Sequence, residues 1–314
     1  MFSLFRSGSF CRVLCRSSSA GQFRGPAVGS TGVALVRQLS AAVRMDFESG
    51  QREMTTTDGV RIVYYDLGEA KAEETIILVP GALGFSQSDY EPQITELSKD
   101  FRVLAMDPRG QGKSRPPERD FPQDFLRREA SDAAQVVEAA GAAAGKVNVL
   151  GWSDGANIGA IMAAQRPDLV KRLVMWGGNA YITQEDVDLY NAAADTSTWS
   201  PRMAEPFVKV YGADGLQKMW TDWLKAMQEL LDAGGDICRE DAKKVTCPTL
   251  LLHGDKDGFV PGFHAEFYRK TIPAPLQYKN FPDGKHNIHL RYAQEFNEIV
   301  RRFLRGEVVG ETSH

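Results

Sequence analysis

The chain has 314 residues, of which 43% are hydrophobic and 25% are charged, and its formal net charge is −4. This composition excludes a disordered, a collagen-like or a disulfide-scaffold protein, and the charge offers no basic field for nucleic acid. The length fits one large domain or two of ordinary size.

The first 45 residues differ sharply from the rest. They hold six arginines and eight serines but no lysine and no acid, and the first acidic residue is Asp46. An arginine-rich, serine-rich, acid-free head is typical of a mitochondrial presequence. A disordered basic head is the alternative, and arginines interrupt every apolar run that a secretory signal would need. The stretch Arg37–Ser40 resembles a matrix-protease site, which predicts cleavage near Ser40-Ala41 and a location in the mitochondrial matrix.

Residues 46–314 form the body, whose net charge is −10 once the six arginines of the head are removed from the total of −4. No stretch approaches the roughly 20 apolar residues that cross a bilayer, so we expect no membrane contact. Short apolar runs alternate with helical stretches, which predicts one α/β domain with a mostly parallel, doubly wound sheet. The expected strands are Arg61–Leu67, Thr75–Val79, Phe101–Met106, Val147–Leu150, Arg172–Trp176, Thr249–Leu252 and Leu276–Phe281, and the expected helices are Asp124–Ala144, Gly155–Ala164 and Tyr292–Leu304.

Residues 181–245 interrupt this alternation. They contain no convincing strand, and Trp199, Trp220 and Trp223 lie among helical segments rich in Asp, Glu and Ala. Ligands of open α/β sheets bind at the carboxyl ends of the strands. We therefore expect a helical insertion that acts as a lid over those ends; a helical layer with a purely structural role is the alternative.

The segment Gly151–Gly155 reads G-W-S-D-G and follows an expected strand directly. G-x-S-x-G between a strand and a helix is typical of a nucleophile elbow, in which a sharp turn lifts the serine hydroxyl clear of the sheet. Both glycines are expected because the backbone segments approach closely. Ser153 is therefore the candidate nucleophile.

A serine hydroxyl needs a base, and the base needs an acid that orients it. His286 follows the last strand of the alternating pattern, whereas His253 ends a strand and His289 opens the final helix. Asp257 lies further beyond its strand than Asp255, which we expect to cap the turn. The order Ser–Asp–His along the chain is that of α/β-hydrolases. A metal site at H-x-D-x-D would lack a second ligand cluster, so we expect neither a metal nor a cofactor.

The developing oxyanion needs backbone donors. One is expected from Asp154, the residue after the nucleophile, and the second from Ala82 or Leu83 in the turn after Thr75–Val79. The stretch Gly110–Ser114 resembles the end of a phosphate-binding loop, but Asp107 stands where that motif requires glycine. We expect a structural turn there.

Several motifs together resemble the α/β-hydrolase family, and within it a branch that hydrolyses α-amino-acid esters. They are PGALG at 80–84, MDPRGQGKSRPP at 106–117, LGWSDG at 150–155, WGGNAY at 176–181, HGDKD at 253–257 and GKHNIHLR at 284–291. The resemblance covers residues 45 to 305 and implies a serine esterase with a helical lid. We expect a monomer, although the sequence leaves the oligomeric state open. It implies Ser153 as nucleophile, Asp257 as acid and His286 as base, and it assigns Asp154 to the substrate's α-ammonium group.

Charge considerations agree with this role of Asp154. An unpaired buried carboxylate is costly, and a cationic amino group on a small-molecule substrate would pair with it. From the residues alone, a carboxylate satisfied by the backbone or by a helix N-terminus is an equal alternative.

Two other functions are compatible with this scaffold. A carbon–carbon bond hydrolase on the same scaffold would need a pocket for an anionic dienoate, which a carboxylate at Asp154 disfavours. A non-catalytic interaction protein would be expected to have lost parts of the triad. Halide- and epoxide-cleaving relatives use aspartate at the elbow, where this chain has Ser153.

Overall fold

The computed structural model describes residues 47–68, 72 and 74–313. The expected presequence and its cleavage site near Ser40-Ala41 lie outside the described residues. No helix within the described part is both long and apolar enough to cross a membrane.

A nine-stranded sheet organises the chain in the order β1-β2-β4-β3-β5-β6-β7-β8-β9. The six strands β3 to β8 pair with one another in parallel, whereas β1, β2 and β9 pair antiparallel at the two edges. The mostly parallel, doubly wound sheet is therefore confirmed. The strands are β1 (Gln51–Thr55), β2 (Arg61–Leu67), β3 (Thr75–Val79), β4 (Arg102–Met106), β5 (Val147–Trp152), β6 (Val170–Trp176), β7 (Thr249–Gly254), β8 (Leu276–Phe281) and β9 (Glu311–Ser313).

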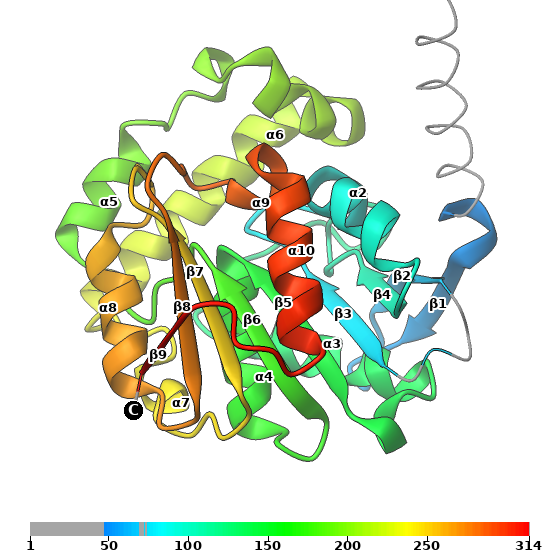
Figure 1. Ribbon diagram of the computed structural model, residues 1–314. Helices are drawn as coiled ribbons and strands as arrows, with labels where there is room; N and C mark the ends of the chain where they lie inside the picture. The colour runs from blue at the N-terminus through cyan, green and yellow to red at the C-terminus, as the bar shows by residue number, and fades with distance from the viewer. Residues whose placement is uncertain (1–46, 69–71, 73, 314) are drawn as a thin grey trace, which may run out of the picture. The chain divides into compact units, whose positions relative to one another are not determined.

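Helices cover both faces of the sheet, which explains why the central strands are apolar at most positions. In β3, Ile76 and Leu78 join the core beneath one helical layer, and Ile77 and Val79 join the core beneath the other. The first layer contains α2 (Ser86–Leu97) and α10 (Ala293–Leu304), and α10 crosses in front of the sheet in Figure 1. The second contains α3 (Phe125–Ala139), α4 (Asp154–Gln165) and α8 (Gly262–Thr271).

The expected helix Asp124–Ala144 is shorter than predicted. It ends at Ala139, and Gly141 beyond it has a φ of 67°. Glycine tolerates this left-handed conformation, which commonly ends a helix. The alanines that follow form the short helix η1 (Ala143–Gly145).

The insertion expected at residues 181–245 is helical, and its long helices lie together at the top of Figure 1. Helix α6 bends sharply at Gly212, whose φ of 73° and ψ of 164° are not helical. The end of the insertion instead belongs to the main core, because α7 packs against α4 and Ala242 is fully buried. The elements are α5 (Gln184–Asn191), η2 (Thr196–Thr198), α6 (Pro201–Asp232) and α7 (Arg239–Ala242).

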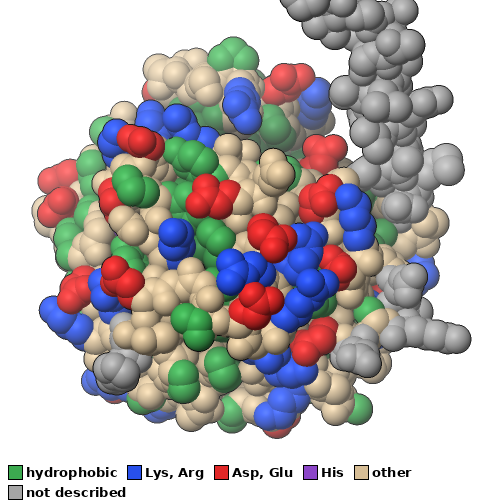
Figure 2. Space-filling model, viewed as in Figure 1, with side chains coloured by type: hydrophobic (Ala, Val, Ile, Leu, Met, Phe, Trp, Pro, Cys, Tyr) green, Lys and Arg blue, Asp and Glu red, His purple; other side chains and the backbone are tan. Residues whose placement is uncertain are grey.

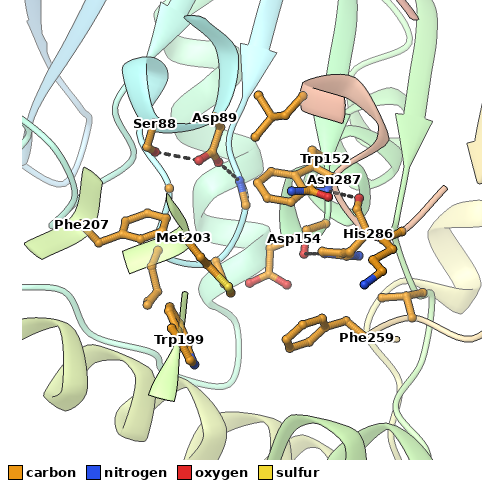
Figure 3. Close-up of a pocket in the computed structure, with 18 of the residues that line it drawn as sticks. Ser88, Asp89, Trp152, Asp154, Trp199, Met203, Phe207, Phe259, His286 and Asn287 are labelled. Carbon is orange, nitrogen blue, oxygen red and sulfur yellow. Dashed lines mark hydrogen bonds between the residues drawn. The ribbon is translucent and has the colours of Figure 1, made fainter. Parts of the chain in front are cut away.

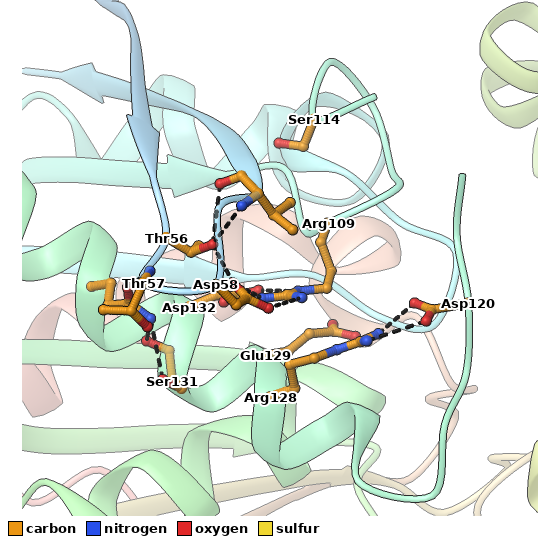
Figure 4. A network of polar contacts seen from close by, with 12 residues as sticks. Thr56, Thr57, Asp58, Arg109, Ser114, Asp120, Arg128, Glu129, Ser131 and Asp132 are labelled. Carbon is orange, nitrogen blue, oxygen red and sulfur yellow. Dashed lines mark hydrogen bonds and ion pairs between the residues drawn. The ribbon is translucent and has the colours of Figure 1, made fainter. Parts of the chain in front are cut away.

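The loop after β4 is the structural turn expected in place of a phosphate-binding loop. Arg109 lies buried between Asp132 of α3 and Asp58 of the β1–β2 turn, with nitrogen–oxygen distances of 2.6 and 2.8 Å (Figure 4). Asp107 accepts hydrogen bonds from the Ser86 amide and hydroxyl at 3.0 and 2.6 Å. The loop is therefore held by buried charges of the protein itself.

Charged side chains of both signs are interspersed on the face shown in Figure 2. Where α10 approaches the end of α2, Arg301 and Arg305 both pair with Asp100. On the described part of this face, basic side chains therefore lie beside acidic ones.

Candidate active site

The elbow lies where β5 ends and α4 begins. Ser153 has a φ of 58° and a ψ of −124°, which residues other than glycine rarely adopt, so the backbone turns sharply at this residue. A Cβ at Gly151 would overlap the carbonyl of Gly155, and one at Gly155 would overlap the carbonyl of Val79. Close backbone contact therefore requires both glycines, as expected from the motif.

The structure brings the three predicted catalytic side chains together. His286 Nε2 lies 3.1 Å from Ser153 Oγ, and His286 Nδ1 lies 2.8 Å from Asp257 Oδ2. Ser153 follows β5, Asp257 follows β7 and His286 follows β8. The carboxyl ends of these three strands share one edge of the parallel sheet. A proton on Nδ1 facing Asp257 leaves the lone pair of Nε2 facing the serine hydroxyl, as a general base requires.

Further hydrogen bonds hold Asp257 and His286 in position. Asp257 Oδ1 accepts from the amides of Phe259 and Val260 at 2.9 and 3.0 Å. Burial alone would raise the pKa of Asp257, but His286 and these amides outweigh it and lower the pKa. The indole of Trp152 donates to the carbonyl of His286 at 2.9 Å. The acid therefore stays ionised beside the base.

The other candidates stay outside this arrangement. His289 belongs to the short helix α9 (Ile288–Arg291) rather than to the final helix, and its ring is fully buried. His253 is buried at the end of β7. Asp255 does not cap the turn with its side chain but accepts from Asn280 of β8 at 3.0 Å. Within the described part of the chain, no three His, Cys, Asp or Glu side chains converge as metal ligands.

The turn after β3 borders the elbow and leaves two amides without acceptors. Among the described residues, the N–H groups of Ala82 and Leu83 donate no hydrogen bond, nor does that of Asp154. Two side chains that the sequence did not single out hold this turn. Asp89 of α2 accepts from the Gly81 amide at 2.9 Å, and Gln111 donates to the Ala82 carbonyl at 2.5 Å.

A cavity of about 580 Å³ opens beside Ser153, between the sheet edge and the helical insertion. Figure 3 shows Asp154 near its centre, with Met203 and Trp199 of the insertion to one side and Phe259 and His286 to the other. The wall is thus largely apolar and aromatic, and a carboxylate lies inside it. The insertion therefore covers the site, which agrees with a lid.

Asp154 is 5% exposed and lies in the first turn of α4. Its Oδ2 accepts from the indole of Trp223 at 2.9 Å, and no backbone group in the described chain donates to this carboxylate. Burial raises its pKa to about 6, against the opposing effects of Trp223 and Arg119. A carboxylate satisfied by backbone hydrogen bonds is thus not observed, whereas the alternative of one stabilised by a helix N-terminus stays open, because Asp154 lies in the first turn of α4.

A protein-family model described as the alpha/beta hydrolase fold matches residues 74–232. Serine hydrolase BPHL of Mus musculus is 43% identical to the chain over 249 residues, which cover 79% of this chain and 84% of that protein. Serine hydrolase BPHL of Homo sapiens is 42% identical over 251 residues, with the same shares covered.

Among solved structures, a hydrolase from Pseudomonas aeruginosa PA01 aligns with a TM-score of 0.65 and 23% identity, covering 81% of this chain and 98% of that one. At this identity the structural likeness supports the fold alone. The two relatives support a serine hydrolase function, and they confirm the resemblance that the sequence motifs indicated. The chain belongs to the α/β-hydrolase family.

Proposed function

We propose that this serine hydrolase cleaves esters of α-amino acids and related activated acyl compounds. The observation that carries the proposal is the carboxylate of Asp154, which faces the cavity beside Ser153 and has one hydrogen-bond donor among the described residues, Trp223. A buried carboxylate is stabilised by a cation that enters with the substrate. An α-ammonium group on the acyl part supplies that cation.

The reaction proceeds through an acyl-enzyme. Ser153 Oγ attacks the ester carbonyl carbon while His286 Nε2 takes the hydroxyl proton, and the carbon–oxygen bond to the leaving group then breaks as His286 returns the proton to it. Water repeats the attack on the acyl-enzyme and releases the amino acid and free Ser153. Asp257 stabilises the imidazolium that forms at each stage.

The developing oxyanion is bound by the amides of Asp154 and Leu83. The carbonyl of Ala82 and the N–H of Leu83 belong to one planar trans peptide and point in opposite directions. Because the carbonyl is directed at the buried side chain of Gln111, the Leu83 N–H is directed away from it. This geometry favours Leu83 over Ala82 as the second donor.

Asp154 then serves the substrate twice. Its backbone N–H binds the carbonyl oxygen of the scissile ester, and its carboxylate binds the amine. Both groups belong to one residue, so the amine and the carbonyl carbon must lie close together in the substrate. This proximity favours an α-amino acyl group over one with a more distant amine.

The two alternative functions are less well supported. An anionic dienoate, as in carbon–carbon bond hydrolysis, would meet the Asp154 carboxylate and be repelled. An interaction protein has no need of the hydrogen-bonded contacts from Ser153 through His286 to Asp257. Failure of Ser153 to react with a fluorophosphonate probe would favour such a protein.

An ester panel tests the proposal directly. Wild type, Ser153→Ala and Asp154→Asn are compared on α-amino-acid esters and on the same esters with the amine acetylated. We expect Ser153→Ala to abolish turnover and Asp154→Asn to lose activity selectively on the free-amine esters. Undiminished turnover by pure Ser153→Ala would refute the mechanism, and equal losses on both ester types would refute the role of Asp154.

The arginine-rich head supports a further proposal, import into the mitochondrial matrix. Fusion of residues 1–45 to a fluorescent protein should direct it to mitochondria, and replacement of the six arginines of that head by glutamine should prevent import. Cytosolic fluorescence of the unaltered fusion would contradict the proposal.

A further inference from the structure

Tyr211 connects the helical insertion to the turn that carries the oxyanion donors. It is the last residue of α6 before the bend at Gly212, and it is 9% exposed. Its hydroxyl donates to the carbonyl of Leu83 at 3.1 Å and accepts from the amide of Gly112 at 3.1 Å. Burial raises the pKa of this hydroxyl above its usual value, so it stays protonated and able to donate.

Leu83 is thereby held on both sides. The peptide before it is fixed through the Ala82 carbonyl by Gln111, and the peptide after it is fixed through the Leu83 carbonyl by Tyr211. Rotation of the first peptide plane would redirect the N–H of Leu83, and displacement of the second would move the Leu83 Cα to which that N–H group is attached. Misdirected donors lose much of their effect, because oxyanion stabilisation depends on donors aimed in advance.

The ring of Tyr211 is packed independently of its hydroxyl. It meets Phe85 edge-on at 6.2 Å, stacks on Phe207 at 6.5 Å, and lies 5.2 Å from the guanidinium of Arg115. Phe207 belongs to the same helix and lines the cavity. The part of α6 that lines the cavity is thus the part that contacts the turn.

Resting on the proposed function, we infer that Tyr211 is a positioning residue. When α6 lies over the site, its hydroxyl holds the Leu83 carbonyl and thereby keeps the Leu83 amide in place beside the nucleophile. A closed lid completes the oxyanion site, and a displaced lid leaves the Leu83 peptide held from one side. Transition-state stabilisation is thereby coupled to closure over the substrate.

Tyr211→Phe tests this inference because it removes the hydroxyl and keeps the ring. We expect kcat on an α-amino-acid ester to fall roughly 5- to 20-fold, less than the loss of an oxyanion donor itself, with KM changed less than about twofold. The affinity of a peptidyl boronate, which forms a tetrahedral adduct at the serine, should fall in parallel. Binding of the intact ester to Ser153→Ala/Tyr211→Phe should match binding to Ser153→Ala.

Two further variants complete the experiment. Gln111→Met removes the other support of the same residue, and its effect on kcat combined with Tyr211→Phe should be non-additive. Tyr181→Phe is the matched control, because Tyr181 lies in the same insertion and its hydroxyl makes no hydrogen bond within the described chain. We expect wild-type kinetics from this control.

The outcomes separate the inference from a structural role and from the proposed function. A rise in KM with unchanged kcat and boronate affinity would mean that Tyr211 only packs the lid, and would overturn the inference. If wild type is active and Tyr211→Phe has the same kcat as wild type, the inference is also overturned, but the proposed esterase function stands. Inactivity of wild type on every ester would instead refute the proposed function.

Discussion

The indole N–H of Trp223 donates to the carboxylate of Asp154 at 2.9 Å, which links the helical insertion to the residue beside the nucleophile. The Trp223 ring stacks on Trp220 at 4.8 Å and is 5% exposed, so its direction is well constrained. One carboxylate oxygen is engaged in this way and the other remains for a ligand. The charge state of Asp154 then controls which substrates are favoured.

Selectivity for free-amine esters should depend on pH. Burial raises the pKa of Asp154 to about 6, so the carboxylate is ionised above that pH and neutral below it. The ratio of kcat/KM for a free-amine ester to that for its acetylated counterpart should fall by up to about tenfold per pH unit below 6. Above roughly pH 7.7 it should fall again as the substrate amine loses its proton.

This ratio isolates Asp154 because protonation of the triad affects both esters equally and cancels. In Asp154→Asn the acidic limb of the ratio should disappear. A ratio in wild type that stays constant between pH 5 and 7 would contradict the predicted role of the carboxylate.

Trp223→Phe should move the acidic limb toward higher pH. The indole hydrogen bond lowers the pKa of Asp154, so its removal raises that pKa further. At pH 6 we expect a several-fold loss of kcat/KM on free-amine esters, with a much smaller loss at pH 8. Trp199→Phe is the control, since its indole donates to the Ala193 carbonyl and not to Asp154. Equal losses at both pH values would indicate altered packing instead.

The sequence was most informative where burial dictates residue type. Strand β3 is apolar from its second residue to its last because helices cover both of its faces, and its predicted bounds agree with the structure. Strand β1, with the sequence QREMT, was missed because it lies exposed at the sheet edge and carries no apolar alternation. Helix α2 was missed as well, and Pro92 within it interrupts the helical pattern.

The triad was predictable because each of its members lies in the loop that follows a strand, and the carboxyl ends of parallel strands meet. The contacts that the insertion makes with the site could not be predicted from the sequence. Trp223 and Tyr211 reach Asp154 and Leu83 across 69 and 128 residues of sequence. Their directions depend on the bend at Gly212, and a glycine in a helical stretch does not by itself reveal the angle of a bend.

Replacement of Arg109 should be strongly destabilising. Its guanidinium compensates the charge of Asp132, whose side chain is 1% exposed. Arg109→Met leaves that charge buried without its partner, which costs about 3–5 kcal/mol in the free energy of unfolding measured with urea. Arg109→Met/Asp132→Leu should recover most of the loss. Lys218→Met, at an exposed ion pair with Asp222, should change stability by less than about 1 kcal/mol.

Recovery in the double variant is the decisive comparison for this network. If Arg109→Met/Asp132→Leu were as unstable as Arg109→Met, the loss would come from the packing of the arginine stem or from its contact with Asp58. The proposed cause, an uncompensated carboxylate at Asp132, would then be wrong.

His289 should make the fold sensitive to acid. Its Nε2 donates to the carbonyl of Asp89 at 3.0 Å, and its Nδ1 accepts from the indole of Trp176 at 3.0 Å. This arrangement requires the neutral ring, and burial lowers its pKa from 6.5 to about 3. Between those two values the unfolded chain binds a proton at this ring that the folded protein does not bind.

The free energy of unfolding should therefore decrease as pH falls from 6.5 toward 3. His289→Gln keeps one donor and one acceptor but does not titrate, so it should lack this contribution. In urea titrations at pH 6.5, 5.5 and 4.5, wild type should lose more stability than the variant, by about 1 kcal/mol over the first pH unit and approaching about 1.4 kcal/mol over the second. Carboxylates such as Asp89 and Asp154 titrate in both proteins and cancel in the difference. Parallel pH profiles would mean that the ring of His289 accepts a proton without loss of the fold, against the assignment of its two hydrogen bonds.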